Sequence, residues 1–182
     1  LVRSRGLGDV YKRQVYWCAK DETALAEAEI EYQDDPCTTV YVKFPMKDDL
    51  GKLGHLDLSK LSFVIWTTTI WTLPGNLAIA LHPDEAYAVV KAPNGEMYIM
   101  AEALTEKVMK IGGFDSYEIV ETHPGRFFEN MLAQHPFLDK TSRLLLADYV
   151  TMDSGTGCVH TAPGFGADDY QTCKRYGMDM VV

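Results

Sequence analysis

One segment, residues 63–76, limits what this chain can fold into more than any other part of the sequence. It begins with the strand-forming run Phe-Val-Ile-Trp, continues as Thr-Thr-Thr-Ile-Trp-Thr, and ends in the turn signal Leu-Pro-Gly-Asn. A strand that only fills a core does not need four threonines within residues 67–72. Hydroxyls gathered in this way suit a small pocket that holds a polar ligand by hydrogen bonds rather than by charge. The segment therefore predicts a buried strand over 61–68 whose end opens into a pocket.

A second informative segment covers residues 155–170 and reads Gly-Thr-Gly-Cys-Val-His-Thr-Ala-Pro-Gly-Phe-Gly-Ala-Asp-Asp-Tyr. Its pattern predicts a strand over 157–162, ended by Pro163, and a helix over 167–176. Two carboxylates stand in the first turn of that helix, and a histidine stands near the end of the strand. These are the candidate functional groups of the segment.

The rest of the chain predicts short strands and few helices, joined by turns rich in Gly and Pro. Asn94-Gly95 is a two-residue hairpin signal, and Gly112-Gly113 is a common helix end. Short, unevenly spaced strands favour a mainly β fold, with a closed or nearly closed β-barrel core and peripheral α-helices. Besides the elements above, the patterns predict helices over 24–30 and 102–111, a turn at 34–36, and strands over 38–44, 85–91, 96–101, 117–122 and 144–148.

The 182 residues fit one domain that can bury a core, but residues 1–14 differ from the rest. They show no periodicity and carry a net charge of +3. We interpret 1–14 as a non-native leader, a tag or vector remnant, and 15–182 as the folded domain; the alternative is a native basic tail. Because the whole chain carries −9, residues 15–182 carry −12. So acidic a body is a poor non-specific binder of DNA or RNA.

The composition argues against several other classes of protein. No stretch approaches the roughly 20 apolar residues that cross a membrane, and the N-terminus lacks the apolar block of a signal peptide. The four cysteines form no Cys-x-x-Cys pair and have no zinc-like spacing with histidine. A disulfide framework is also not expected at this size. We therefore expect a cytoplasmic protein with no membrane contact, and a domain without metal or cofactor.

Taken together, the two segments resemble the threonine-rich peptide and the Gly-Thr-Gly…His-x-Ala-Pro-Gly…Asp-Asp peptide of the editing domain (CP1, the connective peptide) of isoleucyl-tRNA synthetase. Leucyl- and valyl-tRNA synthetases usually have Thr-Thr-Arg-Pro in the first peptide, which this chain lacks. The resemblance runs from about Val15 to the C-terminus. It departs at Ile70, where many relatives have proline, and at Phe165, where many have histidine. The His-Ile-Gly-His and Lys-Met-Ser-Lys-Ser signatures of the synthetic site are absent, so the resemblance implies a fragment of a synthetase that would itself use ATP and Mg²⁺.

The resemblance implies post-transfer editing, the hydrolysis of the ester of mischarged valyl-tRNA(Ile). Isoleucine and valine differ by one methylene, which changes binding in an apolar pocket by about 1–3 kcal/mol, a general figure that itself comes from synthetases of this kind. A second, smaller site corrects the shortfall. The expected partners are the acceptor end of the mischarged tRNA and the remainder of the synthetase. Hydrolysis of the adenylate stays open, and the alternatives are leucyl- or valyl-type specificity and a non-hydrolytic insertion that docks the tRNA 3′ end.

By the same resemblance, the carboxylate of Asp169 binds the α-ammonium of the amino acid. A carboxylate pairs with an ammonium at short range, and the first turn of a helix favours its ionised form. Asp168 is assigned to capping that helix. The resemblance makes His160 a wall of the amino-acid pocket that limits side-chain size; a structural role and a general-base role are the alternatives.

Thr67, Thr68 and Thr69 are assigned to the terminal adenosine, the ester and the attacking water, and Thr72 and Asn76 join them from the turn. Consecutive residues of a strand point to opposite sides, so this assignment requires a bend after the strand. The alternative is the ordinary preference of threonine for strands.

Trp66 and Trp71 are assigned as packing walls rather than as platforms for bases, and Gly157 is placed with Trp66 among the substrate-binding residues. No nucleophile in a Gly-x-Ser-x-Gly context is present. Because an aminoacyl ester is already activated, an oriented water and electrostatic help can suffice. We therefore expect metal-independent hydrolysis.

Overall fold

The computed structural model describes residues 15–32 and 36–178. The leader predicted over 1–14 and most of the turn predicted at 34–36 lie outside the described residues. The chain divides into two compact units, Leu1–Cys37 and Thr38–Val182, and each is described by itself.

The described part of the first unit is a small antiparallel ribbon. β1 (Tyr16–Cys18) pairs with β2 (Thr23–Leu25), and the 3-10 helix η2 (Glu27–Glu29) follows. The helix predicted over 24–30 is therefore wrong. Its Ala- and Glu-rich composition suits a helix, but so short an isolated helix is marginal, and the backbone here pairs as a ribbon instead.

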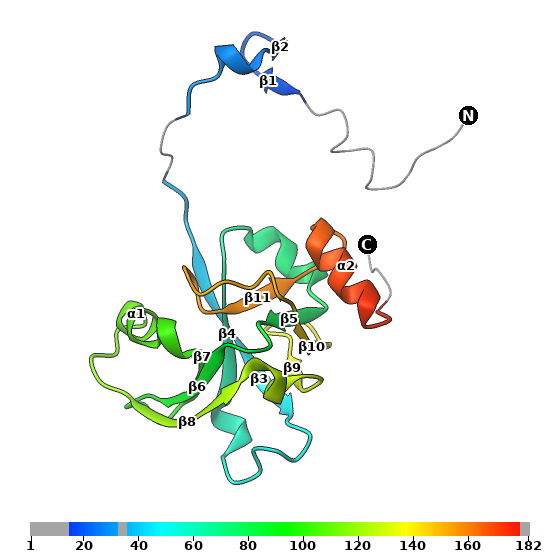
Figure 1. Cartoon of the computed structure of the whole chain (residues 1–182). Helices are drawn as coiled ribbons and strands as arrows, with labels where there is room; N and C mark the ends of the chain where they lie inside the picture. The colour runs from blue at the N-terminus through cyan, green and yellow to red at the C-terminus, as the bar shows by residue number, and fades with distance from the viewer. Residues whose placement is uncertain (1–14, 33–35, 179–182) are drawn as a thin grey trace. The chain divides into compact units, whose positions relative to one another are not determined.

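The second unit is built on one nine-stranded mixed sheet, shown in Figure 1. Its strand order is β11-β5-β10-β9-β3-β4-β7-β6-β8. The hairpin predicted around Asn94-Gly95 is confirmed, because β6 and β7 pair antiparallel across it. The strands are β3 (Val40–Asp48), β4 (Leu61–Thr67), β5 (Ala78–Leu81), β6 (Ala86–Lys91), β7 (Met97–Ala101), β8 (Glu118–Pro124), β9 (Leu132–Gln134), β10 (Thr141–Leu146) and β11 (Cys158–Thr161).

The helices of the second unit are short and peripheral. The helix predicted over 102–111 is confirmed, with its first turn in 3-10 form, and the last helix lies where it was predicted. None of the helices in the described parts of the chain is long and apolar enough to cross a bilayer. The helical segments are η3 (Leu58–Lys60), η4 (Ile70–Gly75), η5 (Glu102–Leu104), α1 (Thr105–Ile111), η6 (Gly125–Phe128) and α2 (Ala167–Arg175).

The mainly β class is confirmed, but the closed barrel is not, because β11 and β8 remain the two edges of the sheet. The sheet curves enough for the amide of Ala101, at the end of β7, to donate to Thr156 O before β11 (2.8 Å). β8 carries mostly exposed side chains, including the charged Glu118, as edge strands commonly do. Short strands and frequent turns occur in curved open sheets as well as in barrels, so the sequence pattern could not separate the two.

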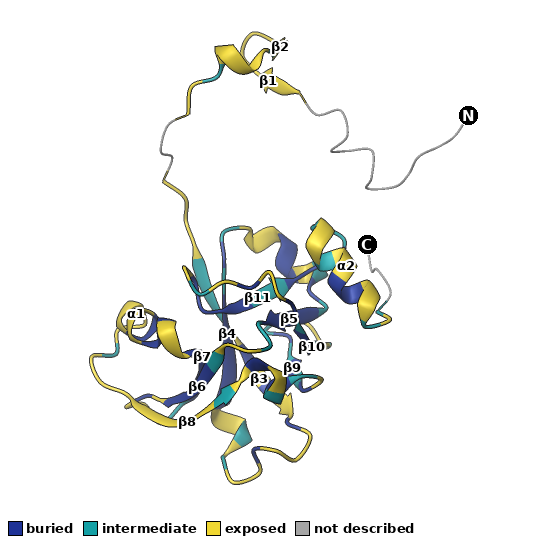
Figure 2. Ribbon diagram, in the orientation of Figure 1, coloured by how far each residue is buried: buried dark blue, intermediate teal, exposed yellow. Residues whose placement is uncertain are grey.

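The buried strand predicted over 61–68 is confirmed as β4, which lies between antiparallel β3 and parallel β7. Its residues Leu61, Phe63 and Ile65 are fully buried, and Figure 2 shows β4 within the dark core of the unit. The sheet therefore fixes the position from which the threonine segment departs.

Sequence patterns missed β5, which proves important for the site. Its run Ala-Ile-Ala-Leu is buried throughout and pairs with β10 on one side and β11 on the other. In this register His160 of β11 lies opposite Ile79 of β5. Four residues were too few for a strand pattern beside the Pro-Gly turn, yet this strand brings the two informative segments together.

Candidate active site

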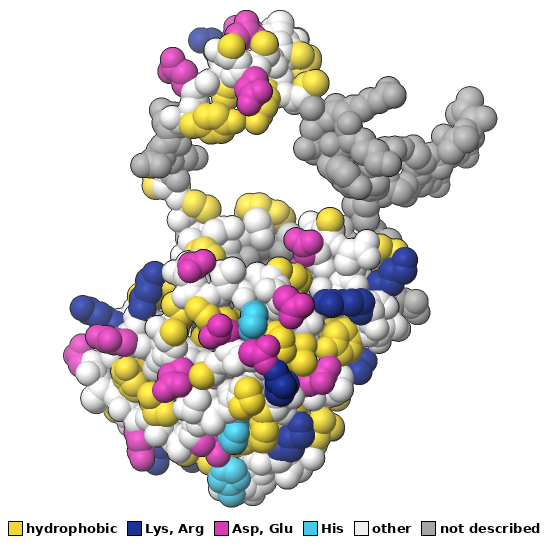
Figure 3. All heavy atoms as spheres, viewed as in Figure 1, with side chains coloured by type: hydrophobic (Ala, Val, Ile, Leu, Met, Phe, Trp, Pro, Cys, Tyr) yellow, Lys and Arg dark blue, Asp and Glu magenta, His cyan; other side chains and the backbone are white. Residues whose placement is uncertain are grey.

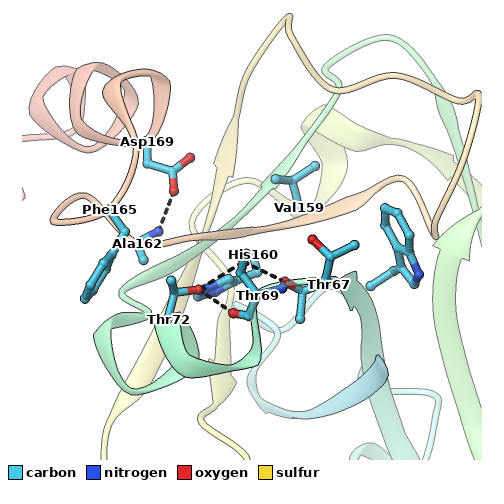
Figure 4. Close-up of a pocket in the computed structure, with 10 residues that line it drawn as sticks. Thr67, Thr69, Thr72, Val159, His160, Ala162, Phe165 and Asp169 are labelled. Atoms are coloured by element: carbon cyan, nitrogen blue, oxygen red, sulfur yellow. Dashed lines mark hydrogen bonds between the residues drawn. The ribbon is translucent and has the colours of Figure 1, made fainter. Parts of the chain in front are cut away.

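A pocket of about 230 Å³ lies where β4, η4, β11 and the start of α2 meet (Figure 4). Seven of the nine predicted site residues line it, although the sequence separates them by about 90 residues. Asn76 and Gly157 do not line it, while three apolar residues that were not predicted do. The lining residues are Trp66, Thr67, Thr68, Thr69, Thr72, Val159, His160, Ala162, Phe165 and Asp169.

The threonines converge because the chain bends sharply after β4, as their assignment required. The amide of Thr69 donates to Thr67 Oγ1 (3.1 Å), and the hydroxyls of these two residues lie 3.3 Å apart. One turn later, in η4, Thr72 Oγ1 donates to Thr69 O (2.8 Å). These local bonds turn three hydroxyls toward one space, which an extended strand could not do.

Hydrogen bonds engage both ring nitrogens of His160. Figure 4 shows the bond between His160 and Thr72. Asn76 Nδ2 donates to Nδ1 (2.7 Å), and Nε2 lies 3.0 Å from Thr72 Oγ1. Because the Thr72 hydroxyl proton is directed to Thr69 O, Nε2 carries the ring proton and donates it to Thr72. The ring is thus neutral and protonated on Nε2.

Burial, together with the smaller effect of charge on the nearby His135 and Lys140, lowers the pKa of His160 to about 4. A neutral ring with both nitrogens engaged has no free lone pair for a water proton. The general-base alternative would require one of the two hydrogen bonds to break. The wall role predicted for His160 fits this rigid arrangement.

Asn76 was predicted to bind substrate, but the structure places it behind His160 and away from the pocket. It is fully buried, and its amide nitrogen also donates to Ala78 O (2.8 Å). Its Oδ1 accepts from Ser142 Oγ (2.5 Å). With these polar groups occupied and no exposed surface, Asn76 acts on the pocket through His160 and not by direct contact.

Gly157 was also predicted to bind substrate, and it lies instead in the core at the start of β11. Its φ of +72° favours glycine, and a Cβ there would stand 2.4 Å from Ala101 Cβ. Its carbonyl accepts from the buried Tyr87 hydroxyl (2.6 Å). Gly157 therefore allows close packing of backbone against β7 and has no place in the pocket.

Asp169 lies in the first turn of α2 and faces the pocket (Figure 4). Its Oδ2 accepts from the amide of Ala162 (2.8 Å). Burial raises the pKa of the carboxyl and the nearby Asp168 raises it further, while the Ala162 bond opposes the shift. The cap predicted at Asp168 is wrong, because Gly166 is the N-cap residue and no side chain caps this helix.

The apolar lining residues Val159, Ala162 and Phe165 carried no signal that sequence reasoning could have used to place them. Phe165 is 61% exposed, and its ring lies against Gly75 at the end of η4, where a Cβ would stand 2.4 Å from it. Together the three supply apolar surface to a pocket that is otherwise lined largely by polar side chains.

The two tryptophans of the threonine segment differ. Trp66 lines the pocket and lies against Gly155, in agreement with the packing role predicted for it. Trp71 is 71% exposed on η4, so its predicted packing role is wrong. No group of three or more His, Cys, Asp or Glu side chains within 15–32 and 36–178 is arranged to hold a metal ion.

Comparison with known proteins gives a consistent result. A family model described as the editing domain of leucyl-tRNA synthetase matches residues 42–182. An isoleucine–tRNA ligase of Caldicellulosiruptor saccharolyticus is 50% identical over 179 residues, and one of Nitratidesulfovibrio vulgaris (strain Miyazaki F) is 48% identical over 171. These matches cover 96% and 93% of this chain but only 19% and 18% of the ligases, so the chain spans about a fifth of their length.

Solved structures agree on the fold. The cytosolic leucyl-tRNA synthetase editing domain of P. knowlesi has a TM-score of 0.63 at 14% identity, with 81% of this chain and 67% of that chain covered. The P. falciparum editing domain has a TM-score of 0.53 at 15% identity, with 64% and 47% covered.

Proposed function

Because the chain belongs to the leucyl-tRNA synthetase editing-domain family, we propose that it is the editing module of an isoleucine-type synthetase and hydrolyses the ester of valyl-tRNA(Ile). The isoleucine assignment rests on its similarity to isoleucine–tRNA ligases over nearly the whole chain. The threonine segment without Thr-Thr-Arg-Pro supports the same choice.

The observation that carries the proposal is the meeting of one carboxylate and a row of hydroxyls in one small pocket. Its volume of about 230 Å³ is below the roughly 300–1,000 Å³ of pockets for larger ligands, which suits a small aminoacyl group. Asp169 binds the α-ammonium, and at short range the opposite charge favours its ionised form despite burial. The apolar residues Val159, Ala162 and Phe165 contact the isopropyl group of valine, and His160 excludes longer amino-acid side chains.

Hydrolysis then proceeds by orientation of a water beside the ester. The threonine hydroxyls hold this water and the ester, and the vicinal ribose hydroxyl of the substrate is a further source of proton transfer. Because both nitrogens of His160 are engaged, the reaction does not use His160 as a base. Nor does it use a protein nucleophile, since no serine stands in a Gly-x-Ser-x-Gly context. It also requires no metal ion.

Contact with the tRNA is local in this proposal, confined to its acceptor end. On the face shown in Figure 3, acidic, basic and apolar side chains of the described residues are interspersed rather than gathered into one basic patch. With a formal net charge of −9, the chain depends on the remainder of the synthetase to hold the body of the tRNA.

The test is deacylation of valyl-tRNA(Ile) and isoleucyl-tRNA(Ile) by the purified chain, with and without EDTA. We expect loss of valine only, unchanged by EDTA. Asp169→Asn should abolish it, whereas the matched variant Asp168→Asn, an exposed neighbour in the same helical turn, should not. Full activity of Asp169→Asn would remove the proposed ammonium contact, and binding of valyl-tRNA without hydrolysis would favour a docking insertion.

A further inference from the structure

A buried chain of hydrogen bonds runs from β10, behind the pocket, to the pocket wall. Ser142 Oγ, fully buried on β10, donates to Asn76 Oδ1 at 2.5 Å. Asn76 Nδ2 donates to His160 Nδ1 at 2.7 Å. His160 Nε2 then donates to Thr72 Oγ1 (3.0 Å), which donates to Thr69 O (2.8 Å).

The direction of each bond in this chain is fixed. A carbonyl oxygen can only accept, so the bond to Ala78 O (2.8 Å) shows which end of the Asn76 amide carries nitrogen. The second hydrogen of that nitrogen meets His160 Nδ1, which must accept. The other end of the amide is an oxygen, and it must receive the Ser142 proton.

The same hairpin, β9–β10, holds the threonine segment at neighbouring points. His135 Nε2 donates to Leu73 O (2.9 Å), and Lys140 Nζ donates to Pro74 O (2.6 Å). Ser142 then reaches Asn76, two residues beyond Pro74. Three side chains of one hairpin thus hold residues 73–76, the end of η4 and its C-cap.

We propose that Ser142 and Asn76 are positioning residues that fix His160 in its Nε2-protonated tautomer and thereby make Thr72 a hydrogen-bond acceptor toward the ligand. The Thr72 hydroxyl has one proton and two lone pairs. The proton goes to Thr69 O, and the first lone pair accepts the His160 Nε2–H. Thr72 Oγ1 also lies 3.5 Å from Thr69 Oγ1, whose own proton can go to Thr67 Oγ1 (3.3 Å) instead. The second lone pair of Thr72 can then accept from a water or an ammonium. With the opposite tautomer, Thr72 would have to donate to His160 instead, and Thr69 O would lose its donor.

The direct test measures the ring of His160 in the 182-residue chain. Nitrogen chemical shifts of ¹⁵N-histidine distinguish a protonated from an unprotonated ring nitrogen, and His160→Gln identifies the His160 signals. Unaltered protein at pH 7 should show Nε2 protonated and Nδ1 free of a proton. Nδ1 protonated in the unaltered protein would overturn the proposal.

Asn76→Asp tests the link between the amide and the ring. A carboxylate oxygen facing Nδ1 must receive a proton, so the ring should become protonated on Nδ1 and its pKa should rise by about one pH unit or more. The positive charges of His135 and Lys140 oppose that rise, and Asp169 lies across the pocket. Unchanged His160 signals would contradict the relay. Asn94→Asp, in the exposed hairpin turn, is the matched control and should leave them unchanged.

Ser142→Ala provides a second variant with a smaller change. It leaves Asn76 Oδ1 without its donor, so the bond to Ala78 O alone holds the amide in its orientation. The His160 nitrogen shifts should therefore move part of the way toward those of the other tautomer. Shifts identical to the unaltered protein would remove Ser142 from the relay. The consequence for the ligand rests on the proposed editing function, but these shifts are measured without tRNA, so the two proposals can fail separately.

Discussion

Acid should destabilise this fold through His160, by an amount that follows from its burial. In the unfolded chain the ring titrates near its ordinary pKa of 6.5, whereas in the folded chain burial lowers the pKa to about 4. Between these values the unfolded state binds a proton that the folded state does not. The free energy of unfolding therefore rises with pH in this window, and the contribution of His160 is lost as the pH falls below 6.5.

The size of the effect follows from the two pKa values. One pKa unit corresponds to about 1.4 kcal/mol, so the full difference amounts to about 3 kcal/mol once the pH is below 4. Relative to pH 7, the loss is about 1 kcal/mol at pH 5.5 and about 2–3 kcal/mol at pH 4.5. These changes are large compared with the total stability of a domain of this kind, about 5–15 kcal/mol.

The assay is urea unfolding at pH 7, 5.5 and 4.5, for the unaltered chain and for His160→Gln. The variant should have lower stability at pH 7 but a shallower pH dependence, and the difference between the two slopes isolates His160 from the carboxylates. His55→Gln changes an exposed histidine and serves as the control. Equal pH dependence of the unaltered chain and His160→Gln would refute the reasoning, because it would mean that burial does not suppress protonation of this ring.

Three further changes have expected outcomes. Asp169→Asn should raise the melting temperature at pH 7, since burial raises the pKa of Asp169 and its ionised form, present above that pKa, costs stability; a lower melting temperature would contradict this. Gly157→Ala should lower the free energy of unfolding by about 2 kcal/mol or more in urea titrations, because of its positive φ and the closeness of Ala101, and a neutral result would show that the backbone can relax. His160→Ala should allow deacylation of isoleucyl-tRNA(Ile), and if the variant still spares it, the size limit lies elsewhere in the pocket.

The sequence predicted the lining of the pocket better than it predicted the shape of the sheet. Residues 63–76 had both a strand pattern and an excess of hydroxyls, so β4 and its polar end were predictable. The open sheet was not, because closure depends on whether β11 and β8 pair, and these edge strands carry no sequence signal for their partners. The four-residue β5 was missed for a related reason, since its neighbours come from distant parts of the chain.

The errors at individual residues have one physical origin. Asn76 and Gly157 stand inside motifs that supply the pocket, and their types suit binding, but type does not reveal which side of a strand or turn a residue faces. Asn76 turns inward because Ser142 and Ala78, which are remote or unremarkable in sequence, complete its hydrogen bonds. Gly157 is required by backbone packing and not by a ligand. A sequence motif therefore marks a site together with the residues that hold it.

Under the proposed function, the direction of the hydrogen bonds accounts for how so acidic a chain would bind an aminoacyl ester in a small polar pocket. Asp169 offers only acceptors when ionised, and Thr72 offers a lone pair because its proton is directed to Thr69 O. These two groups therefore suit ligand groups that donate, namely an ammonium and a water. An aminoacyl ester undergoing hydrolysis brings both. The carboxylate group of the hydrolysis product has no hydrogen to donate, and the negative charge of Asp169 repels it. The arrangement that binds the ester therefore favours release of the acid product.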